Sequence, residues 1–240
     1  MARLPILMYH NISDRFEDSK GLTIAAKKLE EQFEYLKEKG YQTFHFSELE
    51  ALKKTNKFPK KGVIITFDDV YVNQLEIAYP LLKKYQLKAS FFAPFAFIDG
   101  TDTWNNGTKK IMSIQQLKVL DTNIVELGLH SFNHNKYDEL SQEDIQGDFD
   151  KCKLFITEND LNIQNILAYP YGKFPKIEPS KTEFFNILKA NGIAYGLRIG
   201  NRVNSFPFKN DYEIKRIDIK GEDTLQRFKL KLRLGKLKLF

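Results

Sequence analysis

Short apolar runs alternate with amphipathic stretches along the whole chain. The runs are apolar throughout rather than strictly alternating with polar residues, which is typical of strands buried on both faces. Their composition is rich in β-branched and aromatic residues, as in "GVIITFDD" and "KASFFAPFAFI". Eight such runs predict strands at residues 4–9, 41–46, 62–69, 88–98, 123–130, 165–172, 192–200 and 212–219.

The segments between these runs have the period of helices. Leu29, Phe33 and Leu36 recur at helical spacing, and Gly40 ends that helix. The predicted helices are 24–40, 48–54, 74–86, 113–121, 141–159 and 180–192. Strands that alternate with helices favour a parallel sheet covered by helices. Eight strands suggest a closed or nearly closed barrel in a single domain over residues 1–240, with a doubly wound open sheet as the alternative.

The net charge of +6 changes this picture little, because the lysines are spread along the chain. No basic cluster with interleaved aromatic residues is present, so nucleic acid is not expected as a partner. The basic segment at about 222–240 is interpreted as the end of an amphipathic helix, an edge strand with outward lysines, or a weak peripheral contact with acidic lipid headgroups. The first apolar run is too short for a signal peptide, and no transmembrane stretch follows, so we expect a cytoplasmic protein.

Polar side chains occur where the predicted strands end. The set consists of His10, Asp68, Asp69, His130 and Tyr171, with Arg198 and Arg216 inside the last two strands. In an α/β barrel the carboxyl ends of the strands form one face, and active sites are built there. We therefore expect these residues to converge although they are distant in sequence.

The pair Asp68 and Asp69 predicts a cation nearby, because adjacent carboxylates at a buried strand end repel each other and lose hydration. The segment "HSFNH" offers His130 and His134, whose spacing directs both imidazoles to one side of a tight turn or helix start. One carboxylate would complete a two-His, one-carboxylate metal site, and the other would be free as a base. Taken singly, each motif is also compatible with surface histidines or a capping turn.

Four segments together resemble a known family. "TFDDV", "HSFNH" and "AYPYG", in this order, are similar to motifs of the polysaccharide deacetylases (carbohydrate esterase family four), and "PILMYHNI" resembles their exopolysaccharide subgroup. The resemblance implies a deformed (β/α) barrel of about seven to eight mostly parallel strands. It also implies a hydrolase that removes an N-acetyl group from an amino sugar in a polysaccharide, an oligosaccharide or its activated precursor.

The same resemblance implies roles for particular residues. Asp69, His130 and His134 would hold a divalent metal, zinc by default, with cobalt, nickel or iron as alternatives. Asp68 would be the general base, and the backbone N–H of Tyr171 would face the oxyanion. A metal at this position lowers the pKa of water and polarises a carbonyl.

Three departures from the family pattern affect these roles. The first motif ends in Val70 instead of glycine, so the turn there must avoid positive φ or be strained. The arginine that steadies the base is missing from the third motif, and Arg216, or else Arg198, is expected to replace it. No histidine follows His134, so the late Leu-x-His motif is absent, and His10 is the candidate general acid.

Aromatic residues near the predicted site suggest how a sugar would bind. Tyr9, Trp104 and Tyr171 are candidates to stack on sugar rings, and Pro170 adjoins Tyr171. Competing functions are a sugar O-acetyl esterase, a degenerate carbohydrate-binding barrel and a non-haem iron oxygenase, which also uses two histidines and one carboxylate.

Overall fold

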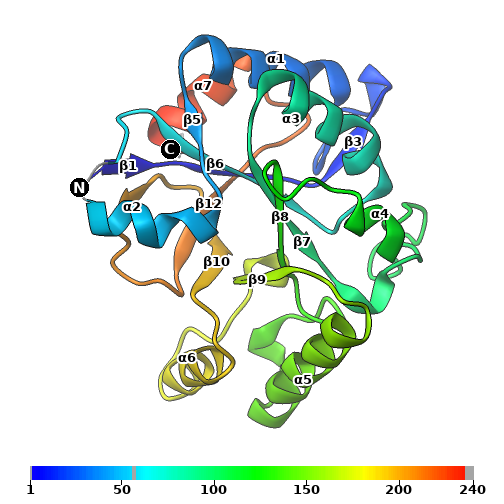
Figure 1. Cartoon of the computed structure of the whole chain (residues 1–240), viewed down its shortest axis with the longest axis vertical. Coiled ribbons are helices and arrows are strands. Elements are labelled where there is room, and N and C mark those ends of the chain that lie inside the picture. Colours follow the sequence, from blue (N-terminus) through cyan, green and yellow to red (C-terminus); the bar gives the residue numbers. More distant parts are fainter. Residues whose placement is uncertain (1, 56–57, 236–240) are drawn as a thin grey trace.

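Seven parallel strands form a closed ring within residues 2–55 and 58–235, which are the residues described by the computed structural model (Figure 1). They follow one another around the ring in chain order: β2 (Ile6–Tyr9), β6 (Gly62–Asp68), β7 (Ala89–Ala93), β8 (Val125–Leu129), β9 (Ile163–Ala168), β10 (Tyr195–Ile199) and β12 (Ile214–Asp218). Pairing of β12 with β2, and of β2 with β6, closes the ring. The predicted barrel is confirmed, and the open-sheet alternative is wrong.

Most helices cover the outside of the ring (Figure 1), whereas the helix at 49–55 packs Leu49 into the cluster that fills the barrel. The helices are α1 (Ala26–Glu38), α2 (Leu49–Thr55), α3 (Tyr79–Tyr85), α4 (Ile114–Lys118), α5 (Gln142–Glu158), α6 (Ser180–Ala190) and α7 (Leu225–Leu234). Short 3₁₀ segments are η1 (Phe16–Asp18), η2 (Phe46–Glu48), η4 (Phe95–Phe97), η5 (Tyr137–Glu139) and η6 (Pro170–Gly172), and η3 (Gln74–Ala78) is a π-helix. Outside the ring, β1 (Ala2–Leu4) pairs with β11 (Asn204–Phe206), β3 (Asn11–Ser13) with β4 (Thr23–Ala25), and β5 (Gln42–Thr43) with the start of β6.

Alternate residues of each strand face the two sides of the barrel wall. Ile64 and Phe92 belong to a buried cluster that fills the barrel, whereas Phe67 belongs to the layer between strands and helices. In that outer layer Phe33 and Leu36 of α1 are fully buried. Each large apolar side chain buried in this way contributes about 1.5–3 kcal/mol. The strands can be apolar throughout because both of their faces are covered.

Most predicted strands are shorter in the structure, and the two that lose the largest share of their length have identifiable causes. The strand at 41–46 is reduced to β5, which lies outside the ring, because the buried Glu126 carboxylate accepts the N–H groups of Phe46 and Ser47 and the chain turns into η2. The strand at 88–98 ends at Ala93, since Pro94 has no N–H to continue the ladder. The ring therefore has seven strands instead of eight.

The basic C-terminal segment begins as a helix. Thr224 caps α7, and Phe228 and Leu232 bury its apolar side, where α7 lies beside α1 (Figure 1). The edge-strand alternative is therefore wrong for 225–234, while residues 236–240 lie outside the described part of the chain. None of the described helices combines the length and apolar character needed to span a bilayer.

Candidate active site

Asp68 is the last residue of β6, and its side chain points into the barrel. Arg216 of β12 donates to it from both terminal guanidinium nitrogens, with Nη1 at 2.5 Å from Oδ1 and Nη2 at 2.8 Å from Oδ2. Burial opposes ionisation of Asp68, but Arg216, His130 and His10 together hold its pKa well below the usual value. Of the two arginines considered from the sequence, Arg216 makes this contact, whereas the Arg198 guanidinium lies 5.9 Å from the ring centre of Phe174.

Asp69 meets the two histidines of "HSFNH". Its Oδ1 lies 3.5 Å from His130 Nε2 and 3.3 Å from His134 Nε2, and one ligand atom from each residue lies within 4.8 Å of the others. His130 Nδ1 is 2.7 Å from the carbonyl oxygen of Ala168. A donor hydrogen bond at Nδ1 leaves Nε2 as an acceptor that faces Asp69, as in metal-binding histidines. Burial lowers the pKa of His130 to about 4, which also favours the neutral imidazole.

These three residues fit a metal ion. Asp69 Oδ1 is buried and has no hydrogen-bond donor within the described structure. An ionised carboxylate in that state is costly unless a cation binds it. In contrast, both oxygens of Asp68 are already bound by Arg216. The geometry thus supports the division predicted from the sequence, with Asp69 as ligand and Asp68 free of the ion.

The backbone around the site is strained. Positive φ occurs at Asp69 (76°), Val70 (45°), Ser131 (63°), His134 (56°) and Tyr171 (56°), all of which are non-glycine residues. For β-branched Val70 this conformation is an outlier. The turn after the two acids therefore takes the strained course that the loss of the family glycine left open. Such strain persists where surrounding structure fixes it, often at functional sites.

His10 lies beside Asp68 in the site. Its Nε2 lies 3.6 Å from Asp68 Oδ2. The buried amide of Gln74 donates to the carbonyl oxygens of both His10 and Asp68, at 3.0 and 2.6 Å. Gln74 thereby links the ends of β2 and β6, and this link places His10 beside Asp68.

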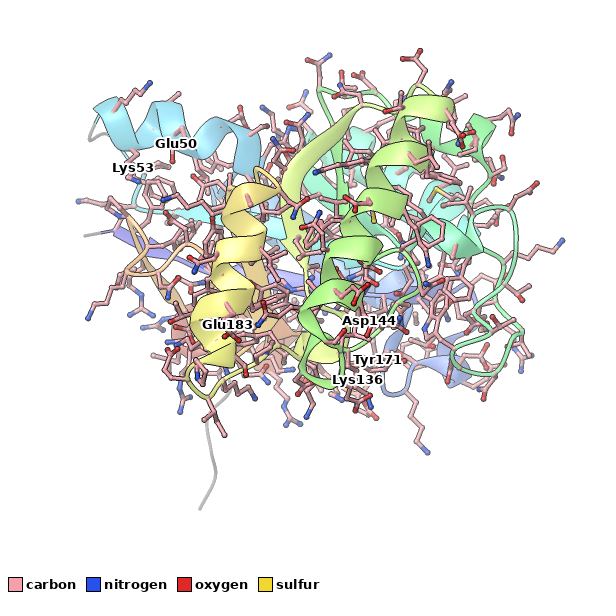
Figure 2. The ribbon with its side chains drawn as sticks, turned by 90° about the horizontal axis from the view of Figure 1, so that it is seen from below. Glu50, Lys53, Lys136, Asp144, Tyr171 and Glu183 are labelled. Atoms are coloured by element: carbon pink, nitrogen blue, oxygen red, sulfur yellow. The ribbon has the colours of Figure 1, made fainter. Side chains whose placement is uncertain are left out.

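The site opens into a pocket of about 380 Å³ that contains most of the predicted residues. Trp104 and Tyr171 line it, and their rings contact the His134 ring at centroid distances of 4.5 and 4.8 Å. Tyr171 is 46% exposed, beside Lys136 and below the start of α5 (Figure 2).

Two predicted sugar-binding residues do not reach this pocket. Tyr9 is 1% exposed, donates its hydroxyl to Gln32, and stacks on Phe67 in the layer between strands and helices. It therefore faces the wrong side of β2 to stack on a sugar. Pro170 is buried beneath Tyr171 in η6 and does not line the pocket.

Several pocket residues were missed in the sequence. Asp218 lines the pocket with one buried oxygen, Oδ1, that lacks a hydrogen-bond partner in the described structure, and Lys220 lies 3.4 Å from its other oxygen. Its position two residues after Arg216 places it on the same face of β12, a signal that the period of a strand carries. Tyr71 lines the pocket as well, and burial followed by the charge of Asp69 raises its pKa.

The family model described as polysaccharide deacetylase matches residues 55–195, more than half of the chain. The chain belongs to the polysaccharide deacetylase family. The resemblance drawn from the four sequence segments is thus confirmed.

Two curated relatives show how far this chain resembles known members of the family. "Putative polysaccharide deacetylase YxkH" of Bacillus subtilis is 33% identical over 176 residues, which are 72% of this chain and 58% of that protein. The poly-beta-1,6-N-acetyl-D-glucosamine N-deacetylase of Staphylococcus aureus is 28% identical over 215 residues, or 86% of this chain and 71% of that protein. The chain thus spans less than two thirds of the first relative.

Solved structures share the fold of this chain over nearly its full length. Streptococcus pyogenes deacetylase PplD has a TM-score of 0.79 at 22% identity, with 98% of this chain and 99% of that chain covered. IcaB from Ammonifex degensii has a TM-score of 0.78 at 20% identity, with 97% and 98% covered. Both confirm the barrel architecture.

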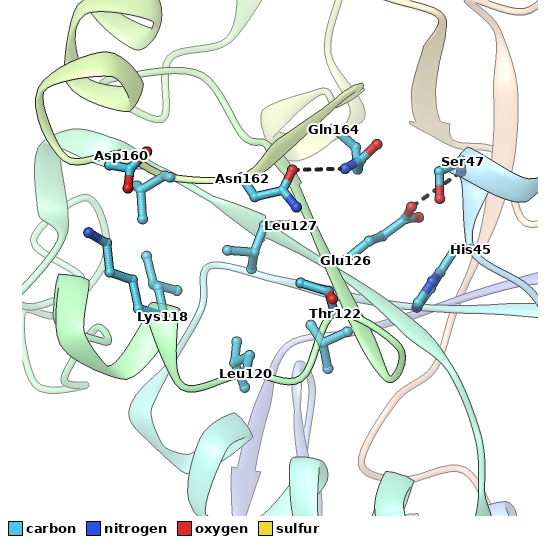
Figure 3. A pocket seen from close by; sticks show the side chains of 13 residues that line it. His45, Ser47, Lys118, Leu120, Thr122, Glu126, Leu127, Asp160, Asn162 and Gln164 are labelled. Carbon is cyan, nitrogen blue, oxygen red and sulfur yellow. Dashed lines mark hydrogen bonds between the residues drawn. The ribbon is translucent and has the colours of Figure 1, made fainter.

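A second cavity of about 260 Å³ lies at the amino ends of the barrel strands (Figure 3). Glu126 and His45 line it, and both are hydrogen-bonded: Glu126 to Phe46, Ser47 and Ser90, and His45 Nε2 to the carbonyl oxygen of Ile124 at 3.1 Å. This contact gives His45 a structural role. These polar groups hold η2 against the barrel.

Proposed function

We propose that this chain is a metal-dependent hydrolase that removes an N-acetyl group from an amino sugar in a polysaccharide, an oligosaccharide or its activated precursor. One observation carries the proposal: a buried two-His, one-Asp cluster lies in the same pocket as a second carboxylate that an arginine holds. Family membership and a relative named as an N-acetyl-D-glucosamine polymer deacetylase support the substrate class.

Asp69, His130 and His134 are proposed to hold the metal ion. Two imidazoles and one carboxylate suit zinc and leave positions open, so zinc is the proposed metal, with cobalt, nickel and iron as alternatives. When bound, such an ion supplies Lewis acidity, which lowers the pKa of water and polarises an acetyl carbonyl.

Asp68 is proposed as the general base. Arg216 keeps this carboxylate ionised and fixes its direction, since both oxygens are bound. A carboxylate with a lowered pKa is a weak base, so it accepts a proton only from an acidified water molecule. A base of this kind is therefore suited to a place beside a cation.

His10 is proposed as the general acid. An amine leaves an amide only when it is protonated, and His10 Nε2, at 3.6 Å from Asp68 Oδ2, lies on the same side of the site as the base. The backbone N–H of Tyr171 is proposed to stabilise the oxyanion, with a typical contribution of about 3 kcal/mol to the barrier. Trp104 and Tyr171 remain the proposed sugar contacts.

Acetate release from a panel of N-acetylhexosamine oligomers, with metal content measured in the same preparation, tests the proposal. We expect release that is lost on chelation and restored by zinc. A metal-loaded, folded protein that releases no acetate from any of these substrates would contradict it and favour a carbohydrate-binding barrel.

The His10→Ala variant separates amide from ester hydrolysis. An activated acetyl ester needs little help in leaving, so we expect release from amides to fall about 100-fold while ester hydrolysis falls far less. Equal losses on both substrates would show that His10 is not the acid. Native activity on O-acetyl sugars alone would instead identify an esterase.

The basic C-terminal helix and the location of the protein are further parts of the proposal. The exposed side of α7 carries Arg227 and Arg233 with the half-exposed Leu230 and Leu234, a pattern that supports weak peripheral contact with acidic headgroups. Vesicle co-sedimentation at low and high salt tests this contact. The cytoplasmic location stays a prediction, which cell fractionation tests.

A further inference from the structure

The two histidines of the candidate metal site are held in different ways. His130 has its ring fixed by the bond between Nδ1 and the carbonyl oxygen of Ala168. His134 Nδ1 is buried and has no hydrogen-bond partner in the described structure, and its ring is stacked on Trp104 at an interplanar angle of 27°. Stacking allows a ring to slide in its plane. Without a hydrogen bond to fix its ring, the position of His134 depends on its backbone and on packing against Trp104 and Tyr171.

That backbone is bound to one carboxylate outside the pocket. Asp148 of α5 accepts hydrogen bonds at Oδ1 from the Ser131 hydroxyl and the Phe132 N–H, each at 2.9 Å. Its Oδ2 accepts from the Tyr137 hydroxyl, also at 2.9 Å. These donors lie on both sides of His134 in sequence, so a single side chain spans the turn.

The turn needs such support because its backbone is unfavourable. Ser131 and His134 have positive φ, at 63° and 56°. Residues with a Cβ persist in this region only when their surroundings fix them. The Ser131 hydroxyl, oriented by Asp148, also accepts the Asn135 N–H at 3.2 Å, and the Ala96 N–H binds the Phe132 carbonyl oxygen at 2.9 Å. Asp148 thus organises bonds within the turn as well as to it.

Asp148 is separate from the reacting groups. It is 5% exposed and does not line the pocket. Burial raises its pKa, and the surrounding N–H and O–H donors oppose that rise. In the described structure these donors bind Asp148 and no cation pairs with it. Burial of such a carboxylate costs free energy, which its hydrogen bonds must offset.

We propose that Asp148 is a positioning residue for the metal site: it holds the 131–137 turn in the conformation that brings His134 Nε2 to 3.3 Å from Asp69 Oδ1. This inference rests on the proposed function, because it takes His134 as a metal ligand. Without Asp148 the turn relaxes, His134 moves out of reach, and a bound ion keeps only Asp69 and His130.

Metal titration of the full chain tests the proposal without relying on turnover. After chelation, zinc affinity is measured by calorimetry, and cobalt is added to record its visible absorption. For Asp148→Ala we expect affinity to fall about 10- to 100-fold, as for other residues that support metal ligands, with an altered cobalt spectrum. Asp148→Asn keeps an acceptor for Ser131 and Phe132 and should recover most of the affinity.

Asp150→Ala is the matched control, because Asp150 lies on the same helix but is exposed. Within the described residues its side chain accepts a hydrogen bond from Gln146. A folded Asp148→Ala protein with the affinity and cobalt spectrum of this control would overturn the proposal. If Asp148→Ala does not fold, Ser131→Ala takes its place, since it removes bonds to Asp148 and Asn135 from the turn side. Unchanged affinity in Ser131→Ala would likewise overturn it.

A different result marks failure of the proposed function. If the unaltered chain binds neither zinc nor cobalt, there is no metal site for Asp148 to support, and the proposed hydrolase fails first. If the unaltered chain binds metal and only the effect of Asp148 is missing, the hydrolase stands and the positioning role is wrong.

Discussion

The two ends of the barrel each bury a carboxylate beside a histidine, yet the two carboxylates differ in their hydrogen bonds. At the carboxyl ends of the strands, Asp69 Oδ1 has no hydrogen-bond donor within the described structure. At the amino ends, Glu126 accepts hydrogen bonds from Phe46, Ser47 and Ser90. Buried polar groups in folded proteins are nearly always paired. The unpaired oxygen of Asp69 therefore indicates a ligand-binding position, whereas the hydrogen-bonded Glu126 is part of the scaffold.

The backbone shows the same contrast. Val70 follows the two acids with φ at 45°, although its side chain is β-branched. His45, next to the Glu126 network, has φ at −80°, in the ordinary extended region. A strained β-branched residue and a missing hydrogen bond thus coincide at the carboxyl ends. At the amino ends Asp160, which lines the second cavity, also has positive φ (48°), but aspartate adopts this conformation more readily than valine. This coincidence, more than any one residue, distinguishes the site from the scaffold.

Removing the unpaired carboxylate should have the largest effect on activity and little effect on folding. We expect Asp69→Ala to lose metal binding and to lower acetate release by about 10⁴-fold or more, because the ion and its chemistry are lost together. The metal-free variant should stay close in stability to the metal-free parent, since Asp69 Oδ1 has no hydrogen-bond partner to lose in the described structure. Inductively coupled plasma analysis and thermal unfolding measure the two effects. A large loss of stability would show that Asp69 belongs to the scaffold.

Asp68→Asn should separate catalysis from metal binding at the same end. The amide cannot take a proton, so we expect turnover to fall by about 10³-fold while metal content stays near that of the parent. Arg216 then remains buried beside a neutral partner, and the free energy of unfolding should fall by a few kcal/mol. Equal metal loss in Asp68→Asn and Asp69→Ala would contradict the division between base and ligand.

The sequence predicted the fold well because strands buried on both faces carry a strong apolar signal. It failed at 41–46, where the decisive contact is a long-range one from Glu126 to the N–H groups of Phe46 and Ser47. A local pattern cannot report a partner that lies 80 residues away. The closure of the ring also depends on the pairing of β12 with β2, which strand count only suggested.

For the site, the sequence located the acids and histidines because motifs mark them, and it narrowed the base-steadying residue to two arginines. Arg216 faces into the barrel, and Arg198 does not contact Asp68. The prediction for Tyr9 was wrong, because side-chain alternation along β2 turns Tyr9 toward α1. The strain at His134 and its support by Asp148 depend on backbone angles and tertiary hydrogen bonds that no local pattern encodes.

His130 should make the stability of the metal-free protein depend on pH. Burial lowers the pKa of folded His130 to about 4, below the unfolded value of 6.5, so the unfolded chain binds the proton first as pH falls. The metal-free protein should therefore lose up to about 3 kcal/mol of stability from His130 between pH 6.5 and 4. Urea unfolding across this range should show the slope reduced in His130→Asn. A slope that is unchanged in this variant would contradict the assignment to His130.

Glu126→Gln should have the smallest effect, and on folding alone. The new amide group faces a backbone N–H that the carboxylate accepted, so a donor is left without an acceptor, at a cost of about 1–3 kcal/mol. Zinc affinity and acetate release per folded molecule should stay at the level of Glu143→Gln, an exposed control on α5. Urea unfolding and steady-state kinetics on the same preparations give both quantities. A purely structural carboxylate affects turnover only through the fraction of protein that is folded. A stable Glu126→Gln protein with impaired turnover would therefore mean that the second cavity, at the amino ends of the strands, influences the active site.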